Sequence, residues 1–299
     1  MNRILPATAS LYNAYEECLN MKKITRRSFL AAAGLSVAAL ALTACGGSSS
    51  SVASSVASSA SSEAASTSAA AGELTTVMAG KLTMATNATF PPYEMTTDSG
   101  DIEGIDVDTA KAIAEKLGLE LQIDDMDFDA ALLSVQQGKA DIAMAGITVT
   151  DERKAVMAFS DSYATGIQSI IVPEGSDIAS PDDLAGKKIG TQRGTTGYIY
   201  CSDDFGDENV VAYDDGLTAV QALNNGQVDA VVIDNAPAQE FIAANPGLKI
   251  LDTAYAQEDY AIGVAKGNTE LLNAINGALE ELQADGTLQS IVDKYIKAE

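Results

Sequence analysis

The stretch Thr109–Ile123, TAKAIAEKLGLELQI, decides the fold class predicted for this chain. Its apolar residues up to Leu117 recur at helical spacing, and Gly118 follows where helices commonly end. The last five residues alternate apolar and polar side chains, as a half-buried strand does. Because the β-prone segment Lys81–Thr86 precedes the helix, the order strand, helix, strand predicts an α/β domain with a largely parallel sheet.

A similar arrangement occurs twice further along the chain. Residues 132–144 and residues 220–232 each contain an amphipathic helix that stops at a glycine, a turn with one aspartate, and an apolar strand. Any α/β unit has this outline, so the match does not by itself establish a repeat. It does indicate two lobes of similar construction.

Polar residues follow both of these apolar strands. The first strand leads to Ala145, Gly146 and Thr148, with Arg153 behind them, and the second leads to Asp234. Ligands of open α/β sheets bind beyond the carboxyl ends of the strands. We therefore expect one lobe to present a cation with hydroxyl donors and the other lobe to present a carboxylate. A free α-amino acid carries the two charges that complement this pair.

Each charged residue also has a simpler interpretation when it is considered alone. Arg153 could be a solvated residue at the start of a helix, and Asp234 could cap the N-terminus of one. Both alternatives stay open at this point.

The composition excludes several classes of function. The 299 residues include 42 acidic and 18 basic ones, and a net charge of −24 argues against binding to nucleic acid. Histidine, the commonest general base and metal ligand, is absent. Cys18, Cys45 and Cys201 show no metal-ligand spacing, so we expect no metal site, no cofactor and no disulfide framework.

The N-terminal region has the layout of an export signal. Residues 21–44 begin with a basic segment and continue into an Ala-rich apolar stretch that is too short for an ordinary membrane span. Within it, Thr25–Leu30 (TRRSFL) resembles a twin-arginine signal, and an ordinary basic region is the alternative. Met21 is the expected start, so residues 1–20 are interpreted as an over-extended start.

The segment that follows the apolar stretch predicts a lipid anchor. Leu42–Gly46, LTACG, resembles a bacterial lipobox, in which a diacylglyceryl group is attached to the cysteine, here Cys45. The Ser- and Ala-rich residues 45–78 cannot bury enough apolar surface to fold and are predicted to be a tether. We expect the chain to be lipid-anchored to the outer face of the cytoplasmic membrane.

Several motifs together resemble one family, the polar amino-acid-binding proteins of bacterial ABC importers, or solute-binding family 3. They are Gly104–Lys111 (GIDVDTAK), Met126–Asp129 (MDFD), Ala145–Arg153 (AGITVTDER) and Phe159–Tyr163 (FSDSY). The likeness extends from about residue 81 to 299. It implies a periplasmic-binding-protein-like fold of type II, with two α/β lobes joined by a two-crossing hinge. Lobe 1 would comprise 79–163 plus 262–299, and lobe 2 would comprise 164–261.

The resemblance also implies roles for the charged residues. Arg153 would hold the α-carboxylate of the ligand, helped by the hydroxyl and backbone N–H of Thr148. Thr196, in the loop that opens a helix after Gly190, would add N–H groups, and a helix N-terminus favours an anion on physical grounds too. Asp234 would hold the α-ammonium group.

Further residues would complete the ligand site. Ala145 or Gly146 would contribute a carbonyl to the ammonium group. Phe90 and Phe128 would sandwich the aliphatic stem of the ligand, although lone aromatic residues usually belong to a core.

The residues that would read the ligand's side chain depart from some relatives. Asn87 stands where glutamine- and histidine-binding members carry an aspartate, and Gln192 and Ile233 occupy positions that vary with specificity. Loss of a carboxylate favours a neutral polar ligand such as glutamine or cystine over lysine or arginine. Glu94 or Asp127 could supply the missing charge, so basic amino acids stay open.

The resemblance leads to a function without catalysis. We expect a monomeric receptor that captures a free polar amino acid, closes, and docks on an ABC permease driven by its ATPase. An alternative is a dehydratase of similar fold that acts on cyclohexadienyl acids. Another is a sensing module for a separate membrane kinase.

Overall fold

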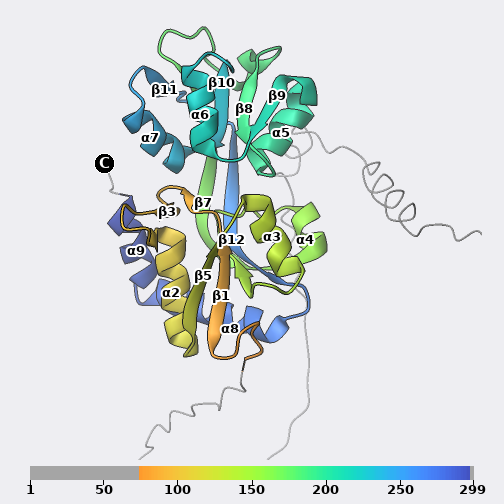
Figure 1. The fold of residues 1–299 in the computed structure, drawn as a ribbon, viewed down its shortest axis with the longest axis vertical. Helices are drawn as coiled ribbons and strands as arrows, with labels where there is room; N and C mark the ends of the chain where they lie inside the picture. Colours follow the sequence, from red (N-terminus) through yellow and green to blue (C-terminus); the bar gives the residue numbers. More distant parts are fainter. Residues whose placement is uncertain (1–73, 297–299) are drawn as a thin grey trace, which may run out of the picture. The chain divides into compact units, whose positions relative to one another are not determined.

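The computed structural model describes residues 74–296, which form two lobes (Figure 1). The predicted start 1–20, the signal 21–44, Cys45 and most of the 45–78 tether lie outside the described residues. No helix within residues 74–296 is long and apolar enough to cross a membrane.

One mixed sheet runs through both lobes. Its strands are β1 (Lys81–Thr86), β5 (Glu120–Asp125), β6 (Ile142–Ala143), β7 (Met157–Pro173), β8 (Ile189–Gln192), β9 (Val210–Tyr213), β10 (Ala230–Asp234), β11 (Leu248–Ile250) and β12 (Ala256–Ala265). Across the sheet they follow the order β5-β1-β6-β12-β7-β10-β8-β9, and β11 pairs with β7.

Helices cover this sheet in each lobe. The α-helices are α2 (Ile105–Leu117), α3 (Phe128–Gln136), α4 (Asp151–Val156), α5 (Thr196–Phe205), α6 (Gly216–Asn224), α7 (Asn235–Ala244), α8 (Thr269–Ala284) and α9 (Thr287–Tyr295). The 3₁₀ helices are η2 (Pro181–Leu184) and η3 (Asp207–Asn209). Figure 1 shows α2, α8 and α9 in one lobe and α5, α6 and α7 in the other.

The predicted strand, helix, strand unit is confirmed in the first lobe. Strand β1 pairs in parallel with β5 on one side and with β6 on the other. Helix α2 begins at Ile105 and is followed by Gly118, whose φ of 69° lets the chain turn back toward β5. Its buried Ile113 belongs to a core that also contains Leu82 and Met84 of β1 and Ile275 of α8.

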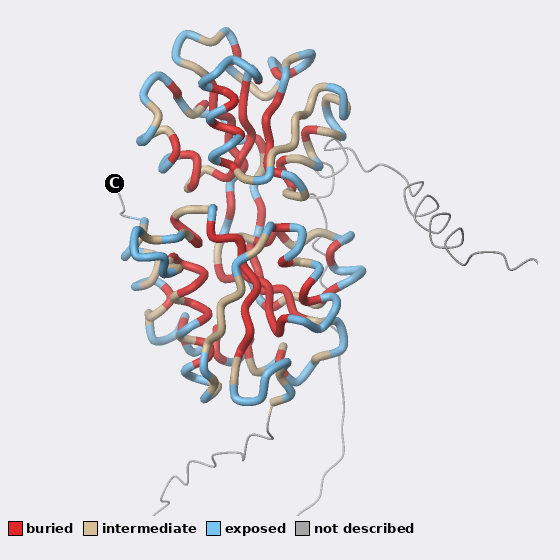
Figure 2. The backbone as a smooth tube through the Cα atoms, in the orientation of Figure 1, coloured by how far each residue is buried: buried red, intermediate tan, exposed pale blue. Residues whose placement is uncertain are grey.

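The second lobe has a core on both faces of its sheet. Strand β8 lies between β9 and β10 and is parallel to both. Val231 and Ile233 pack with α6 and α7, whereas Ala230 and Val232 pack with Cys201 of α5. Successive residues of a strand point to opposite faces, which explains the alternation. Figure 2 shows the buried residues concentrated along the strands of both lobes.

Two long strands connect the lobes. Strands β7 and β12 pair antiparallel from Met157↔Ala265 to Gln168↔Ala256. In the first lobe β12 also pairs with β6, and in the second lobe β7 also pairs with β10. The predicted two-crossing arrangement of the fold therefore consists of this paired ribbon, which is visible between the lobes in Figure 1.

Each of the two similar sequence segments contains a turn aspartate that accepts a backbone hydrogen bond from a neighbouring strand. Asp141, in the turn before β6, accepts the backbone N–H of Thr83 at 2.8 Å. Asp229, in the turn before β10, accepts the backbone N–H of Lys188 at 2.7 Å. Each turn aspartate thus fastens the start of a neighbouring strand, which supports the prediction of similar lobes.

A small sheet lies beside the first lobe and carries two pocket residues. It contains β2 (Thr89–Phe90), β3 (Glu94–Thr96) and β4 (Ile102–Glu103). Gly104 follows it, with a φ of 142°, and a Cβ atom there would lie 2.1 Å from the carbonyl oxygen of Tyr93. Glycine is required at this position because the two backbone segments approach so closely.

The last residues of the predicted tether contact the first lobe. Val77 donates its backbone N–H to Asp141 Oδ1 at 2.7 Å, and Leu74 packs against the core of this lobe. Folded structure therefore begins a few residues before Lys81.

Candidate functional site

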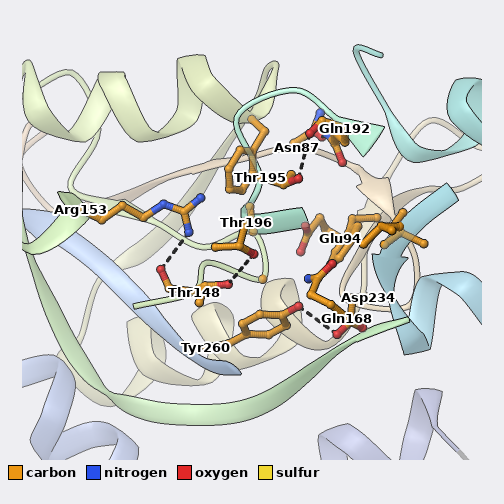
Figure 3. Close-up of a pocket in the computed structure, with 16 residues that line it drawn as sticks. Asn87, Glu94, Thr148, Arg153, Gln168, Gln192, Thr195, Thr196, Asp234 and Tyr260 are labelled. Carbon is orange, nitrogen blue, oxygen red and sulfur yellow. Dashed lines mark hydrogen bonds between the residues drawn. The ribbon is translucent and has the colours of Figure 1, made fainter. Parts of the chain in front are cut away.

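A pocket that is partly open to solvent is lined by residues of both lobes. Its lining includes all the residues predicted to bind ligand: Asn87, Phe90, Phe128, Ala145, Gly146, Thr148, Arg153, Gln192, Thr196 and Asp234. It also includes Glu94, Gln168, Thr195, Val232, Ile233 and Tyr260 (Figure 3). The structure brings these residues together, and the role of each toward a ligand stays a prediction.

Arg153 is held in a buried position at the start of α4. Thr150 caps this helix and accepts the backbone N–H of Arg153. The guanidinium donates from Nη1 to the carbonyl oxygen of Thr148 at 2.8 Å and from Nη2 to that of Gly194 at 3.1 Å. It also lies 5.3 Å from the ring centre of Phe128.

Arg153 forms no direct ion pair within residues 74–296, although the negative charge of Glu258 partly offsets the effect of burial on its pKa. The residue is 8% exposed, so it is not a solvated residue, and burial lowers the pKa of its guanidinium. Because a buried charge is costly unless it is paired, this position favours an anionic group of a ligand.

Asp234 occupies the other charged position, at the end of β10. Its Oδ1 accepts the N–H of Ala236 at 3.0 Å, so it does cap α7. Its Oδ2 accepts the N–H of Ile167 at 2.8 Å and the hydroxyl of Tyr260 at 3.0 Å. Burial raises the pKa of Asp234 to about 6, against the opposing effect of these hydrogen bonds. The helix-capping interpretation and the pocket position therefore both hold for this residue.

Two threonines lie near Arg153. Thr196 opens α5, a helix of ten residues whose N-terminus faces the pocket wall. Its hydroxyl lies 3.4 Å from that of Thr148. The Thr148 hydroxyl donates to Glu258 Oε2 at 3.0 Å, so its proton points away from the predicted ligand carboxylate.

The two amide side chains predicted to read the ligand contact each other. Asn87 directly follows the last residue of β1, and Gln192 is the last residue of β8 in the other lobe. Gln192 Nε2 donates to Asn87 Oδ1 at 2.8 Å, and Asn87 Nδ2 donates to the carbonyl oxygen of Met126 at 3.0 Å. This buried pair joins the lobes directly.

Aromatic rings form one wall of the pocket. Phe90 stacks on Tyr93 with 5.7 Å between ring centres, and Tyr93 meets the edge of Tyr260 at 5.5 Å. Gly146 has a φ of 55°, and a Cβ atom there would lie 2.8 Å from Phe90. The Gly146 N–H donates to Asp106 Oδ2 at 2.9 Å, which holds this part of the wall.

Glu94 is the most deeply buried carboxyl group in the pocket lining. Its side chain is 0% exposed, and it shares a hydrogen bond with the carboxyl group of Asp106. Burial, together with the nearby Asp106, raises the pKa of Glu94 well above its usual range.

The sequence analysis missed Gln168, Thr195, Val232 and Tyr260 as pocket residues. Gln168 has no clear signal in the sequence, because its strand also contains other polar residues such as Asp161, Thr165 and Ser169. Tyr260 has no such signal either, because its position depends on how β12 pairs with β7. Among residues 74–296 no cluster of three or more acidic, cysteine or histidine side chains could hold a metal ion.

Comparison with known proteins places this geometry in context. The chain matches the model of a family described as "Bacterial extracellular solute-binding proteins, family 3" over residues 82–298. It is 33% identical to the L-cystine-binding protein TcyJ of Escherichia coli (strain K12), over 74% of this chain and 84% of that protein. It is 32% identical to ABC transporter arginine-binding protein 1 of the same organism, over 73% of this chain and 91% of that protein.

Solved structures show the same fold. An ancestral arginine-binding protein bound to glutamine superimposes with a TM-score of 0.71 and 43% sequence identity, over 74% of this chain and 100% of that one.

Proposed function

This chain belongs to the bacterial extracellular solute-binding proteins, family 3, and we propose that it captures a free polar α-amino acid in the pocket between its lobes. One observation carries the proposal. A buried arginine that forms no ion pair within residues 74–296 and a buried aspartate line the same pocket. An α-amino acid supplies a carboxylate to the first and an ammonium group to the second.

The proposed grip uses groups from both lobes. Arg153, the N–H of Thr148 and the N-terminus of α5 at Thr196 would bind the α-carboxylate. Asp234 would bind the α-ammonium group, with a carbonyl of Ala145 or Gly146. A ligand that lacks either charge would leave a buried charge unpaired, which is why this site would select α-amino acids.

Other pocket residues would contact the remainder of the ligand. Phe90 and Phe128 would pack against its aliphatic stem. Asn87 and Gln192 would border its side chain, and their mutual hydrogen bond would also favour closure of the lobes.

Capture would be coupled to transport through closure. Binding of a ligand by both lobes would shift a population of open molecules toward the closed form, with β7 and β12 as the hinge. The closed form would deliver the amino acid to an ABC permease and its ATPase. A relative named as an ABC transporter arginine-binding protein supports this step, and we propose no catalysis.

The predicted export signal and the predicted lipobox support an extracytoplasmic location for this receptor. We propose that cleavage at Cys45 and attachment of a diacylglyceryl group anchor the monomeric chain to the outer face of the cytoplasmic membrane. Residues 45–78 would then tether the folded lobes to that surface.

Calorimetric titration tests the proposal. The chain is unfolded and refolded to remove carried-over ligand and is titrated with the twenty amino acids, cystine and ornithine. We expect tight binding of one or a few of them, weakened about 100-fold or more in Arg153→Ala and in Asp234→Ala. Arg193→Ala, which removes an exposed arginine beside the pocket loop, serves as the matched control and is expected to bind normally. Absence of binding heat with every amino acid would contradict the proposal.

A further inference from the structure

Tyr260 of the hinge strand β12 contacts the carboxylate that is proposed to bind the ammonium group. Its hydroxyl donates to Asp234 Oδ2 at 3.0 Å, and both residues line the pocket (Figure 3). Tyr260 is 1% exposed and Asp234 is 2% exposed, so this bond is shielded from water. The same oxygen accepts the backbone N–H of Ile167 on β7 at 2.8 Å. One oxygen of Asp234 is therefore fastened to both hinge strands.

A glycine on the neighbouring hinge strand makes room for the ring of Tyr260. Tyr260 pairs with Ala164 of β7, and Gly166 is the diagonal neighbour, within reach of an aromatic side chain. A Cβ atom at Gly166 would lie 2.3 Å from Cζ and 2.5 Å from the hydroxyl oxygen of Tyr260. Gly166 is not among the glycines with positive φ, so space for the ring, rather than backbone conformation, requires glycine here. A larger residue at this position would displace the hydroxyl.

Two further features hold the ring in this direction. The pairing of β12 with β7 changes register between Tyr260 and Ala261, and such bulges re-aim a side chain. In the first lobe, Tyr93 meets the edge of the ring of Tyr260 with 5.5 Å between ring centres. The ring is thus fixed by the hinge strands and the first lobe, while its hydroxyl reaches Asp234 in the second lobe.

The hydroxyl of Tyr260 also favours the ionised form of Asp234. Burial raises the pKa of Asp234 to about 6, and the bond from Tyr260 is one of those that oppose this effect. Burial and the nearby Asp234 raise the pKa of Tyr260 well above its usual range, so the hydroxyl keeps its proton and remains a donor. The other titratable groups around Asp234 are Glu258 of β12, whose charge raises the pKa of Asp234 further, and Tyr93, with Glu94 and Arg153 elsewhere in the lining.

Resting on the amino-acid capture proposed above, we propose that Tyr260 is a positioning residue whose hydroxyl orients the Asp234 carboxylate toward the α-ammonium group of the ligand. Oδ1 is bonded to the N–H of Ala236, and Oδ2 is bonded to Ile167 and Tyr260, so the carboxylate cannot rotate without breaking these bonds. Its remaining lone pairs keep a fixed direction, and little order has to be imposed when the ligand binds.

Affinity measured as a function of pH tests the inference. Tyr260→Phe removes the hydroxyl and keeps the ring that packs against Tyr93. The refolded wild type and the variant are titrated by calorimetry between pH 5 and 8 with each of the twenty amino acids, cystine and ornithine that binds in the titration described above. We expect the variant to bind about tenfold more weakly at pH 7, because it loses a hydrogen bond to a charged group.

The pH profile separates positioning from a merely structural role. Asp234 has to be ionised to bind an ammonium group, so the affinity of the wild type is expected to fall as the pH drops below about 6. Loss of the hydroxyl raises the pKa of Asp234 further. In Tyr260→Phe the fall is therefore expected to begin about one pH unit higher than in the wild type.

Tyr255→Phe is the matched control. The hydroxyl of Tyr255 donates to Asp204 Oδ2 at 2.8 Å, and Tyr255 is 2% exposed. Neither residue lines the pocket. This variant loses the same kind of bond elsewhere in the second lobe, and it is expected to keep the affinity and the pH profile of the wild type.

The possible failures are distinguishable. If Tyr260→Phe binds as tightly as the wild type, or binds more weakly with an unshifted pH profile, this inference is wrong while amino-acid capture stands. If no amino acid binds the wild type, the proposed function and the inference are both overturned. If Tyr260→Phe does not fold, as judged by circular dichroism, Gly166→Ala is titrated in its place, and an unshifted profile there overturns the inference.

Discussion

Thr148 donates its hydroxyl proton to Glu258 Oε2 across 3.0 Å, and this bond joins the loop before α4 to the hinge strand β12. The same oxygen accepts the amide of Gln168, on the other hinge strand, at 3.0 Å. Glu258 is 6% exposed, and its negative charge is the largest influence that opposes the effect of burial on the pKa of Arg153. One carboxylate thus links both hinge strands to the proposed carboxylate-binding group.

We expect Glu258→Gln to tighten amino-acid binding. The carboxylate partly neutralises Arg153 and would repel the α-carboxylate of a ligand, and it also holds the hydroxyl proton of Thr148 away from that group. Replacement by an amide is expected to raise the affinity about tenfold. Calorimetric titration measures the change, with Glu240→Gln on the exposed face of α7 as a control. Weaker binding by Glu258→Gln would mean that this residue supports the ligand site mainly through its hydrogen bonds.

The stability of the ligand-free chain should fall as the pH rises from about 4 to 6. Burial raises the pKa of Asp234 from 3.8 to about 6, and that of Asp106 likewise from 3.8 to about 6. Between these values the folded chain holds protons that the unfolded chain has released. A rise in pH therefore favours unfolding, by roughly 2 to 3 kcal/mol for each group.

Denaturant unfolding at pH 4, 5, 6 and 7 measures this dependence. The Asp234→Asn variant lacks one of the two titrating carboxyl groups. The free energy of unfolding of this variant is therefore expected to decline less between pH 4 and 6 than that of the wild type. Parallel curves for the two proteins would show that Asp234 titrates as it does in the unfolded chain.

The hydrogen bond between Gln192 and Asn87 should favour the closed form even without ligand. Gln192→Ala removes a buried bond between the lobes, which typically contributes about 1 kcal/mol. We expect a larger radius of gyration for the ligand-free variant in small-angle scattering, together with about fivefold weaker amino-acid binding. Arg193→Ala is the neighbouring control. An unchanged radius would indicate that other contacts determine closure.

Gly104→Ala should destabilise the chain far more than Gly100→Ala. Both glycines have positive φ, 142° and 88°, so both substitutions strain the backbone. At Gly104 a Cβ would also lie 2.1 Å from the backbone oxygen of Tyr93, whereas at Gly100 no atom lies within 4 Å. We expect a loss of about 1 kcal/mol at Gly100 and at least about 3 kcal/mol at Gly104, measured by denaturant unfolding. Equal losses would show that the backbone around Tyr93 moves easily.

The sequence by itself determined the fold class and much of the pocket lining. Local periodicity and Gly118 were enough to predict the strand, helix, strand unit, because helices and strands have different hydrophobic periods. Arg153 and Asp234 could be expected at a ligand site because each follows an apolar strand, and ligands of open α/β sheets bind beyond the carboxyl ends of the strands.

Tertiary structure alone decided how the charges in that pocket are balanced. The burial of Glu94, the bond between Glu258 and Thr148, and the position of Tyr260 all depend on segments far apart in the chain. No local pattern encodes such contacts, because desolvation and hydrogen bonding depend on what packs around a group rather than on its neighbours in sequence. The kind of ligand site was therefore visible in the sequence, whereas the burial and hydrogen bonding of its charged groups became visible only when both lobes and the hinge strands were in place.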